Sequence, residues 1–531
     1  MSIGDIDVVA RRGMVTSTKP LASLAGREIL QSGGNAVDAA IATALALCVV
    51  QPSSNGIAGY GGCMVIYLAD ERRAVAIDYN CRAPRAASPD MYELASGPEP
   101  DSWGAFPAVV GGANKFGPLA VSVPGTIAGL SLAEETYGKL GWAEVVEPAR
   151  KLAANGFEVY STLPENMKGF ADNTDPESAG ALFPDGRIPQ EGEIWVQPDL
   201  AELLEILADD PSALYRGEPA WRIVDRVRSM GGILSEEDMA QYSIEVTEPL
   251  TFDYRGQRIY ASSGLTGSPT AFETLGILQR LCEGGYAPED PAYWGDLADA
   301  LTLAWRDRFT ILGDVPGIAE KIQELLSDEY ARSRAELVRA GEVVQLPAGT
   351  DSSKETIHLS TCDADRNMVA LTQTHGGGWG SRFGIPGLGI VLGHGMSRFD
   401  PRPGLPNSVG PWKEVLHNMS PLILALGDGS VAAVGLPGGR TIPSVVAQFV
   451  VDVVDFGMTP GRMLAVPRIH AEGAAIQVTD DLPDGARKEM ERRGHRLKRM
   501  NSIGGLASGL VAGDHEIIGS ARAGSEAALG I

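Results

Sequence analysis

The sequence contains few cysteines, and none is placed as a structural cysteine site requires. Its five cysteines, an odd number among 531 residues with no CxxC pair, are Cys48, Cys63, Cys81, Cys282 and Cys362. Disulfide frameworks and zinc ribbons are built from paired cysteines at short, regular spacings. The cysteine pattern therefore indicates neither kind of site.

Long apolar runs and export signals are also lacking. The longest apolar run, Ala39 to Val50, has about a dozen residues, whereas a membrane-spanning helix needs about 20. The first residues, MSIGDIDVVARRGM, carry two aspartates and no apolar stretch like that of a secretory signal. These patterns predict a cytoplasmic protein without a membrane partner.

Positive charge is scarce. Lys and Arg number 44 against 68 Asp and Glu, which gives a formal net charge of −24, and basic stripes are absent from the sequence. A surface of this sign repels nucleic acid and anionic lipid. We expect no nucleic-acid partner, and a substrate carboxylate would need a local cationic pocket to bind against this field.

Two glycine-rich motifs lack the partners that their best-known functions need. HGGGWG (375–380) could form an esterase oxyanion loop, but the sequence has no GxSxG nucleophile elbow. GIPGLG (384–389) fits a dinucleotide pattern, yet a proline interrupts the turn and no helix-forming run follows. A glycine-rich loop beside a pocket is the favoured interpretation of the first motif.

Histidine spacing gives no support for a metal site. All seven histidines follow position 357, and none lies in an HxH or HxxxH arrangement. We expect neither a metal nor another cofactor, although one or two of these imidazoles can line a pocket.

The order of periodic segments predicts a layered α+β architecture. Two helices are expected around the Gly33-Gly34 stop, the second capped by Asn35 and ending near Val50. Two short strands follow, CMVIYLA and RAVAIDYN, and helical patterns dominate the middle, including 294–345. Strands and glycine-rich loops prevail from Thr356 onward, and no linker separates independent domains.

The segment KETIHLSTCDADRNMVALTQT (354–374) predicts a β-hairpin with hydroxyl residues at both ends. Thr356 follows a polar loop and opens the first strand. A threonine hydroxyl is a weak nucleophile unless a base is adjacent, and the α-amine of a chain-terminal threonine supplies one. From this pattern alone, Thr356 is either an ordinary strand residue or a nucleophile that self-cleavage exposes.

Several segments resemble the γ-glutamyltranspeptidase family in collinear order along nearly the whole chain. They include MVTSTKPLASLAGREILQSGGNAVDAAIATALAL, VSVPGTIAGLSLAEETYGKLGWAEVVEPARKLAANGFEV, TIHLSTCDADRNMVALTQT and NMSPLILALGDGSVAAVGLPGG. The resemblance implies an N-terminal-nucleophile hydrolase with a four-layer αββα sandwich. It also implies self-cleavage between Glu355 and Thr356, giving a large subunit 1–355 and a small subunit 356–531 that remain one interwoven heterodimer.

The same resemblance implies roles for four positions. Thr356, which opens the T-x-H-x-S motif, would be nucleophile and, through its freed α-amine, base. Thr374 would orient the nucleophile, and Gly438 and Gly439 of the LPGG turn would supply the oxyanion-hole N–H groups.

The positions that would bind an amino-acid substrate depart from the family pattern. They are Asn80, where the family has an arginine, with Arg82 nearby, Gly376, His394, Arg398, His417 and Asn418. Gly376 replaces an asparagine, and Arg398 stands where an acid would pair with a substrate ammonium. The departures predict an amide substrate other than glutathione.

Three alternatives remain at this level. One is an orthodox γ-glutamyltransferase or glutathione hydrolase that uses Arg82. Another is a biosynthetic enzyme recruited to C–C cleavage, and the third is an unprocessed homologue that only binds a ligand.

Overall fold

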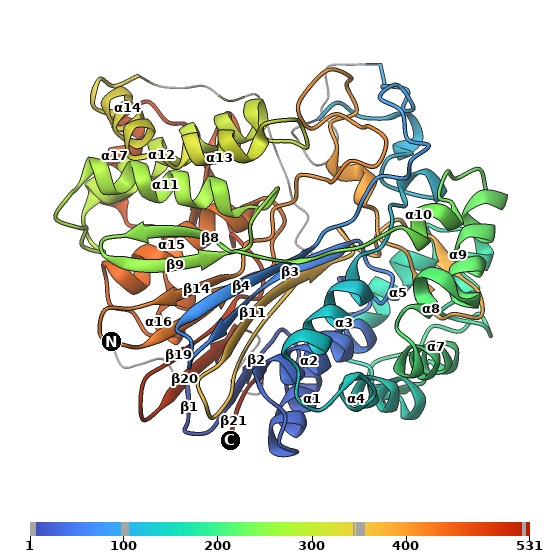
Figure 1. The fold of residues 1–531 in the computed structure, drawn as a ribbon. Coiled ribbons are helices and arrows are strands. Elements are labelled where there is room, and N and C mark those ends of the chain that lie inside the picture. Colours follow the sequence, from blue (N-terminus) through green and yellow to red (C-terminus); the bar gives the residue numbers. More distant parts are fainter. Residues whose placement is uncertain (1–6, 97–105, 343–345, 347–355, 523–526) are drawn as a thin grey trace.

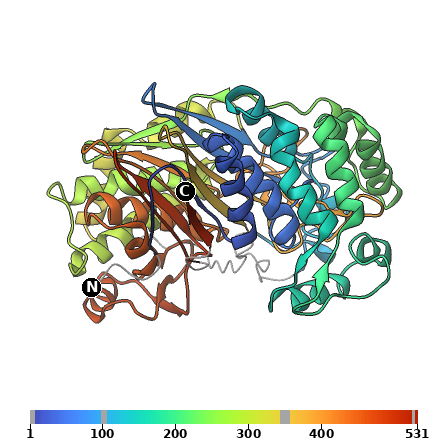
Figure 2. The same cartoon turned by 90° about the horizontal axis from the view of Figure 1, so that it is seen from below.

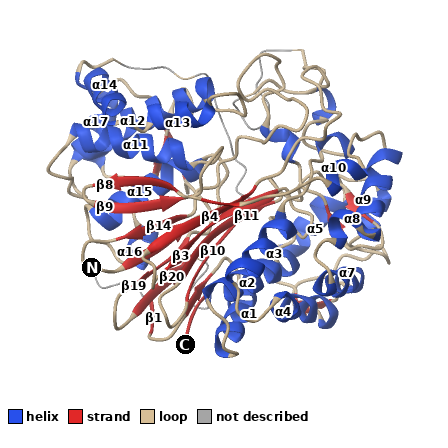
Figure 3. Ribbon diagram, in the orientation of Figure 1, coloured by secondary structure: helices blue, strands red, loops and turns tan. Residues whose placement is uncertain are grey.

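Two antiparallel sheets lie face to face between two layers of helices (Figures 1 and 3). The computed structural model describes residues 7–96, 106–342, 346, 356–522 and 527–531. The layer order confirms the α+β, four-layer αββα sandwich that the sequence predicts.

Among the described residues each sheet has seven strands, and their order in the sheet differs from their order along the chain. The first sheet runs β1 (Val8–Ala10), β20 (Ile517–Ala521), β19 (Ser508–Ala512), β15 (Val431–Gly435), β14 (Leu422–Ala425), β9 (Gln257–Ala261), β8 (Leu250–Tyr254). The second sheet runs β21 (Ala528–Gly530), β2 (Met14–Thr16), β10 (Ile357–Cys362), β11 (Met368–Thr374), β3 (Gly61–Leu68), β4 (Arg73–Tyr79), β7 (Val246–Thr247).

The fold also contains shorter strands and 3-10 helices. The short strands are β5 (Phe157–Glu158), β6 (Ile194–Trp195), β12 (Gly384–Ile385), β13 (Ile390–Val391), β16 (Ile469–His470), β17 (Ile476–Thr479) and β18 (Leu497–Met500). The 3-10 helices are η1 (Val110–Gly112), η2 (Pro118–Ala120) and η3 (Gly395–Arg398).

Alternation along the strands divides the core into layers. In β3, Met64 and Ile66 belong to the apolar cluster beneath the helices, whereas Val65 and Tyr67 belong to the cluster between the sheets. Because successive side chains of a strand point to opposite faces, a strand buried on both faces reads as a continuous apolar run. This explains the uninterrupted CMVIYL sequence.

Helices from the N-terminal part of the chain cover the second sheet (Figure 2). They are α1 (Pro20–Gln31), α2 (Ala36–Val50), α3 (Thr126–Tyr137) and α4 (Trp142–Asn155), with α5 (Leu163–Ala171), α6 (Pro176–Gly180), α7 (Pro198–Asp209), α8 (Ala213–Arg216), α9 (Glu218–Ser229) and α10 (Glu236–Ala240) further out. The C-terminal end lies between the blue helices and the red strands in the same view.

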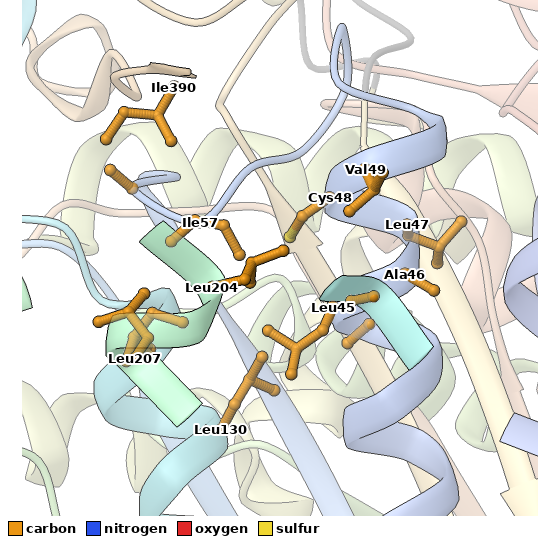
Figure 4. Close-up of a cluster of buried hydrophobic side chains, with 14 of the residues drawn as sticks. Leu45, Ala46, Leu47, Cys48, Val49, Ile57, Leu130, Leu204, Leu207 and Ile390 are labelled. Atoms are coloured by element: carbon orange, nitrogen blue, oxygen red, sulfur yellow. The ribbon is translucent and has the colours of Figure 1, made fainter. Parts of the chain in front are cut away.

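The helix α2 is buried along its whole length. As the sequence predicts, α1 ends before Gly33-Gly34, and Asn35 caps α2 by accepting the N–H groups of Val37 and Asp38. The helix packs with Leu130 of α3 and Leu204 of α7 in the cluster drawn in Figure 4. An all-round apolar helix of this kind belongs in the interior.

The first sheet is covered on its outer face by the remaining helices. These are α11 (Ser268–Leu281), α12 (Pro291–Ile311), α13 (Ile318–Leu325), α14 (Asp328–Arg339), α15 (Thr441–Val454), α16 (Pro460–Ala465) and α17 (Asp484–Arg492). Over the described residues, the helical block expected at 294–345 consists of three helices, α12, α13 and α14. Gly317 has a left-handed conformation before the second of them.

A buried pair of acids connects α2 with α3. Asp38 accepts the backbone N–H groups of Asn35 at 2.6 Å and Lys139 at 3.0 Å. Glu134 accepts the N–H of Gly141 at 2.8 Å. Burial, together with the neighbouring Asp38 carboxylate, raises the pKa of Glu134 to about 7.

Because the folded-state pKa of Glu134 lies above its unfolded value, the free energy of unfolding should fall as the pH rises from about 4.3 to about 7. Glu134→Gln keeps an acceptor for Gly141 and places an amide beside Asp38. The full pKa difference corresponds to about 3.7 kcal/mol. Because solvent screens part of it, we expect the variant to gain about 2 kcal/mol of unfolding free energy over the wild type between pH 4.5 and pH 8, measured by urea unfolding. The exposed neighbour variant Glu135→Gln should show no such gain, and an equal gain in both would contradict this assignment.

Candidate active site

The hairpin of β10 and β11 brings its two hydroxyl ends together. In the register, Ile357 pairs with Gln373, so the next position along places Thr356 opposite Thr374. The Thr356 hydroxyl donates to Oγ1 of Thr374 at 3.2 Å, and both residues are buried. The predicted hairpin and the meeting of its ends are thus confirmed.

The same register sets the direction in which Thr356 faces. His358 packs against Gly435 of the first sheet, where an added Cβ would lie 2.3 Å from the imidazole Cε1. Since alternate residues share a face of a strand, Thr356, His358 and Ser360 all face the first sheet. The T-x-H-x-S pattern is the sequence signature of this inner strand face.

His358 has a structural role between the two sheets. Its Nδ1 lies 2.9 Å from the Thr372 hydroxyl, and its Nε2 lies 3.2 Å from the Ser360 hydroxyl. Burial lowers the pKa of His358 to about 3, so the imidazole is neutral at pH 7. Both ring nitrogens thus have hydroxyl partners within the core.

The LPGG turn leads from β15 into the N-terminus of α15. Gly438 has φ +147° and Gly439 has φ +58°, conformations that favour glycine. The Thr441 hydroxyl donates to the Gly438 carbonyl at 2.7 Å. Within the described parts of the chain, neither glycine N–H donates to another group, so both can bind an anion at this positive helix end.

A pocket of about 380 Å³ contains Thr356. We call it the nucleophile pocket, after the role that the sequence predicts for Thr356. Its described lining consists of Thr18, Lys19, Gln51, Ser53, Ser54, Tyr160, Thr162, Asn166, Thr356, Pro437, Ser502, Gly504, Gly505, Leu506 and Arg522. No carboxylate or imidazole is among these described lining residues. A threonine hydroxyl needs a base to become a nucleophile.

Gly376 joins Thr374 to the far side of the site. Its N–H donates to the Thr374 hydroxyl at 2.8 Å, and its carbonyl accepts from Arg398, which is buried. Its φ is +101°, and an added Cβ would lie 2.3 Å from the ring of His394. Burial and the charge of Arg398 lower the pKa of His394 to about 3.

Comparison with known proteins assigns this constellation to a family. A family model described as Gamma-glutamyltranspeptidase matches residues 22–528. The chain belongs to the gamma-glutamyltranspeptidase family. The acylase ACY 1 proenzyme of Pseudomonas sp. (strain SE83) is 35% identical over 503 residues, covering 93% of this chain and 88% of the relative. The glutathione hydrolase proenzyme of Escherichia coli (strain K12) is 31% identical over 536 residues, covering 97% and 90%.

A solved structure agrees with this assignment. The crystal structure of cephalosporin acylase from Bacillus halodurans superimposes with a TM-score of 0.84 at 29% identity, covering 97% of this chain and 95% of that one. The chain is therefore an enzyme of the gamma-glutamyltranspeptidase family, an amidohydrolase or acyltransferase with the N-terminal-nucleophile fold. None of the helices described is both long and apolar enough to cross a membrane.

Two positions expected to bind substrate lie at the end of β4. Arg82 forms an ion pair with Glu414 and donates to the Trp412 carbonyl at 3.1 Å. The Asn80 amide donates to the Val415 carbonyl at 2.8 Å. Both side chains thus connect β4 to the segment 412–415, and Arg82 already has an acidic partner.

The two residues before Met419, His417 and Asn418, contact charged side chains of other segments. His417 Nε2 lies 3.4 Å from Asp78 Oδ1, and Asn418 Oδ1 accepts from Arg308 at 2.9 Å. Burial and the neighbouring Arg440 lower the pKa of Arg308 to about 9, and its guanidinium also donates to the His417 carbonyl at 2.7 Å. The structure brings Gly376, His394 and Arg398 into one group beside Thr374, and His417 and Asn418 into contact with Arg308.

Other parts of the site lie outside the sequence expectations or the described residues. Glu355, the residue before the expected cut, belongs to the undescribed segment 347–355. Lys19, Tyr160 and Arg522 line the nucleophile pocket but stand out in no sequence motif. They come from distant segments, so only the folded chain identifies them.

Because an added Cβ at Gly376 would lie so close to the ring of His394, we expect Gly376→Ala to lower the free energy of unfolding substantially. Gly33 has a similar φ, +95°, with no atom within 4 Å of an added Cβ, so Gly33→Ala is a matched control for backbone strain alone. Strain costs about 1 kcal/mol at each position. Only Gly376→Ala adds a steric clash, and we expect it to lower the urea midpoint more. In a His394→Ala background the excess cost should vanish, and an unchanged excess would contradict the clash.

Proposed function

We propose that the chain is a self-processing amidohydrolase whose nucleophile is Thr356 and whose substrate is not glutathione. The observation that carries this proposal is the Thr356 hydroxyl, 3.2 Å from Thr374 in a pocket without a carboxylate or imidazole in its described lining. A base is then available once Thr356 starts a chain, because its freed α-amine has a pKa of about 7.7–8.0.

Maturation and catalysis use the same hydroxyl. In the proposed maturation, Thr356 Oγ attacks the carbonyl before it, giving an ester that water hydrolyses. In each later turnover the α-amine takes the Oγ proton, Oγ attacks the substrate amide, and the amine leaves with that proton. Water then hydrolyses the acyl-enzyme ester.

The neighbouring groups have complementary roles. Thr374 holds the Thr356 hydroxyl, and the Gly376 N–H fixes Thr374 in turn. The N–H groups of Gly438 and Gly439 would stabilise the tetrahedral oxyanion. Loss of such a donor typically costs about 3–4 kcal/mol of transition-state stabilisation.

The sheet order supports a heterodimer that stays together after cleavage. In the second sheet, β10 and β11 from 356–531 lie between β2 and β3 from 1–355. In the first sheet, β14 pairs with β9 across the same division. Both sheets would therefore hold the proposed subunits together, and relatives bear the description proenzyme.

If the chain cleaves itself, we expect two fragments in place of the 55.9 kDa chain on a denaturing gel. N-terminal sequencing of the smaller fragment should read Thr-Ile-His-Leu-Ser. Thr356→Ala should stay a single inactive chain, because it lacks the attacking oxygen. Thr361→Ala, in the same strand, should still be cut. An active wild-type enzyme that remains one chain would refute the proposal.

The proposed substrate follows from the altered acyl pocket. We propose that Asn80, Arg82, Gly376, His394, Arg398, His417 and Asn418 shape that pocket. Arg398 places a cation beside the site, which disfavours the ammonium of a γ-glutamyl group. The acylase and cephalosporin acylase names of relatives fit an acyl group of another kind.

Glutathione should accordingly be a poor substrate. We expect its kcat/KM to lie at least about tenfold below that of an N-acyl amide without an α-ammonium group, equivalent to about 1.4 kcal/mol. Release of the free amine, followed by chromatography, measures both. Efficient, saturable glutathione hydrolysis would instead favour an orthodox glutathione hydrolase, like the Escherichia coli relative.

A further inference from the structure

The nucleophile pocket differs in charge from the chain around it. The whole sequence carries a net charge of −24, yet the described lining includes Lys19 and Arg522 and no carboxylate. Hydroxyl and amide side chains make up much of the rest. The two cations of this described lining contribute a positive potential, which favours anions.

Lys19 is held at the wall of the pocket. It is the N-cap residue of α1, followed by Pro20 at the first helical position. Its ammonium lies 3.3 Å from the ring centroid of Tyr160, in a cation–π contact. Because both residues line the pocket, the contact places a positive charge within reach of a ligand there.

Arg522, from the C-terminal part of the sequence, also lines the pocket. Its backbone N–H donates to the Ala507 carbonyl at 2.8 Å, which fixes the backbone of Arg522 directly after β20. Among the described residues, its guanidinium forms no ion pair, and the residue is exposed. A planar guanidinium can bind a carboxylate through two parallel hydrogen bonds.

We infer that the nucleophile pocket is a subsite for a carboxylate of the amide substrate, bound by Lys19 and Arg522. This inference rests on the proposed function, since it takes Thr356 as the residue that attacks the amide. The volume of about 380 Å³ suits a small-molecule ligand. The carboxylate belongs to the acyl group or to the leaving amine, and both present the same chemistry to the two cations.

Three chromogenic amides distinguish a carboxylate on the acyl group from one on the leaving amine. Pentanoyl 4-nitroanilide is neutral, glutaryl 4-nitroanilide carries a carboxylate on the acyl group, and pentanoyl 3-carboxy-4-nitroanilide carries one on the leaving amine. We expect one carboxylate amide to exceed the neutral one in kcat/KM by about tenfold. That advantage should be lost in Lys19→Gln and in Arg522→Gln, because kcat/KM for the carboxylate amide falls much more than kcat/KM for the neutral amide.

A matched charge control keeps the test specific. Lys498→Gln removes the same charge from an exposed position outside the pocket and should preserve the advantage. Equal rates for all three amides in the wild type would overturn the inference. The inference would also be overturned if Lys19→Gln and Arg522→Gln lowered kcat/KM equally for charged and neutral amides. The same would hold if Lys498→Gln abolished the advantage of the carboxylate amide as they do.

A binding measurement separates this inference from the proposed function. Titration calorimetry of wild-type protein with glutarate and with 3-carboxy-4-nitroaniline requires no turnover. Binding of either that weakens about tenfold in Arg522→Gln supports the subsite even if the chain is not cut at Thr356. Absence of binding by both in a protein that is cut and hydrolyses pentanoyl 4-nitroanilide would overturn the subsite and leave the proposed function standing.

Discussion

The register of the β10–β11 hairpin is the constraint on which the rest of the site depends. Because side chains alternate along a strand, a slip of one residue would turn Thr356 toward the helices. His358 secures the register from within, since its ring contacts Gly435 across the sheets and bonds to Thr372. Its burial keeps it neutral, so a histidine in the middle of the motif belongs to the core.

Glycines with positive φ position the backbone groups at both ends of the site. At one end, Gly438 and Gly439 have positive φ in the turn before α15, and within the described chain their N–H groups donate to no other group. At the other, Gly376 donates to Thr374 while its carbonyl accepts from Arg398. A chain of hydrogen bonds therefore runs from Arg398 to Thr356. Arg398 contacts the site through the Gly376 carbonyl, so its influence on Thr356 is indirect.

The nucleophile pocket draws on both parts of the chain. Lys19 and Tyr160 come from 1–355, whereas Thr356, Pro437 and Arg522 come from 356–531. In both sheets a block of strands from 356–531 lies between strands from 1–355, so the pocket forms only when the two parts fold together. Its positive side chains oppose the acidic field of the molecule, as binding of an anion to this chain requires.

The sequence by itself determined the local elements, the layered fold class and the family. Alternation and the DADRN turn predicted the hairpin, Gly33-Gly34 and Asn35 predicted the ends of α1 and α2, and collinear motifs predicted the αββα sandwich. It also marked Arg398 and Gly376 as departures from the family. Only the tertiary structure decided what those departures contact: Arg398 meets the Gly376 carbonyl, and Arg82 is paired with Glu414. It alone brought Lys19 and Arg522 to one pocket. The reason is physical: periodicity and capping act between near neighbours, whereas contacts between remote segments depend on how the layers pack.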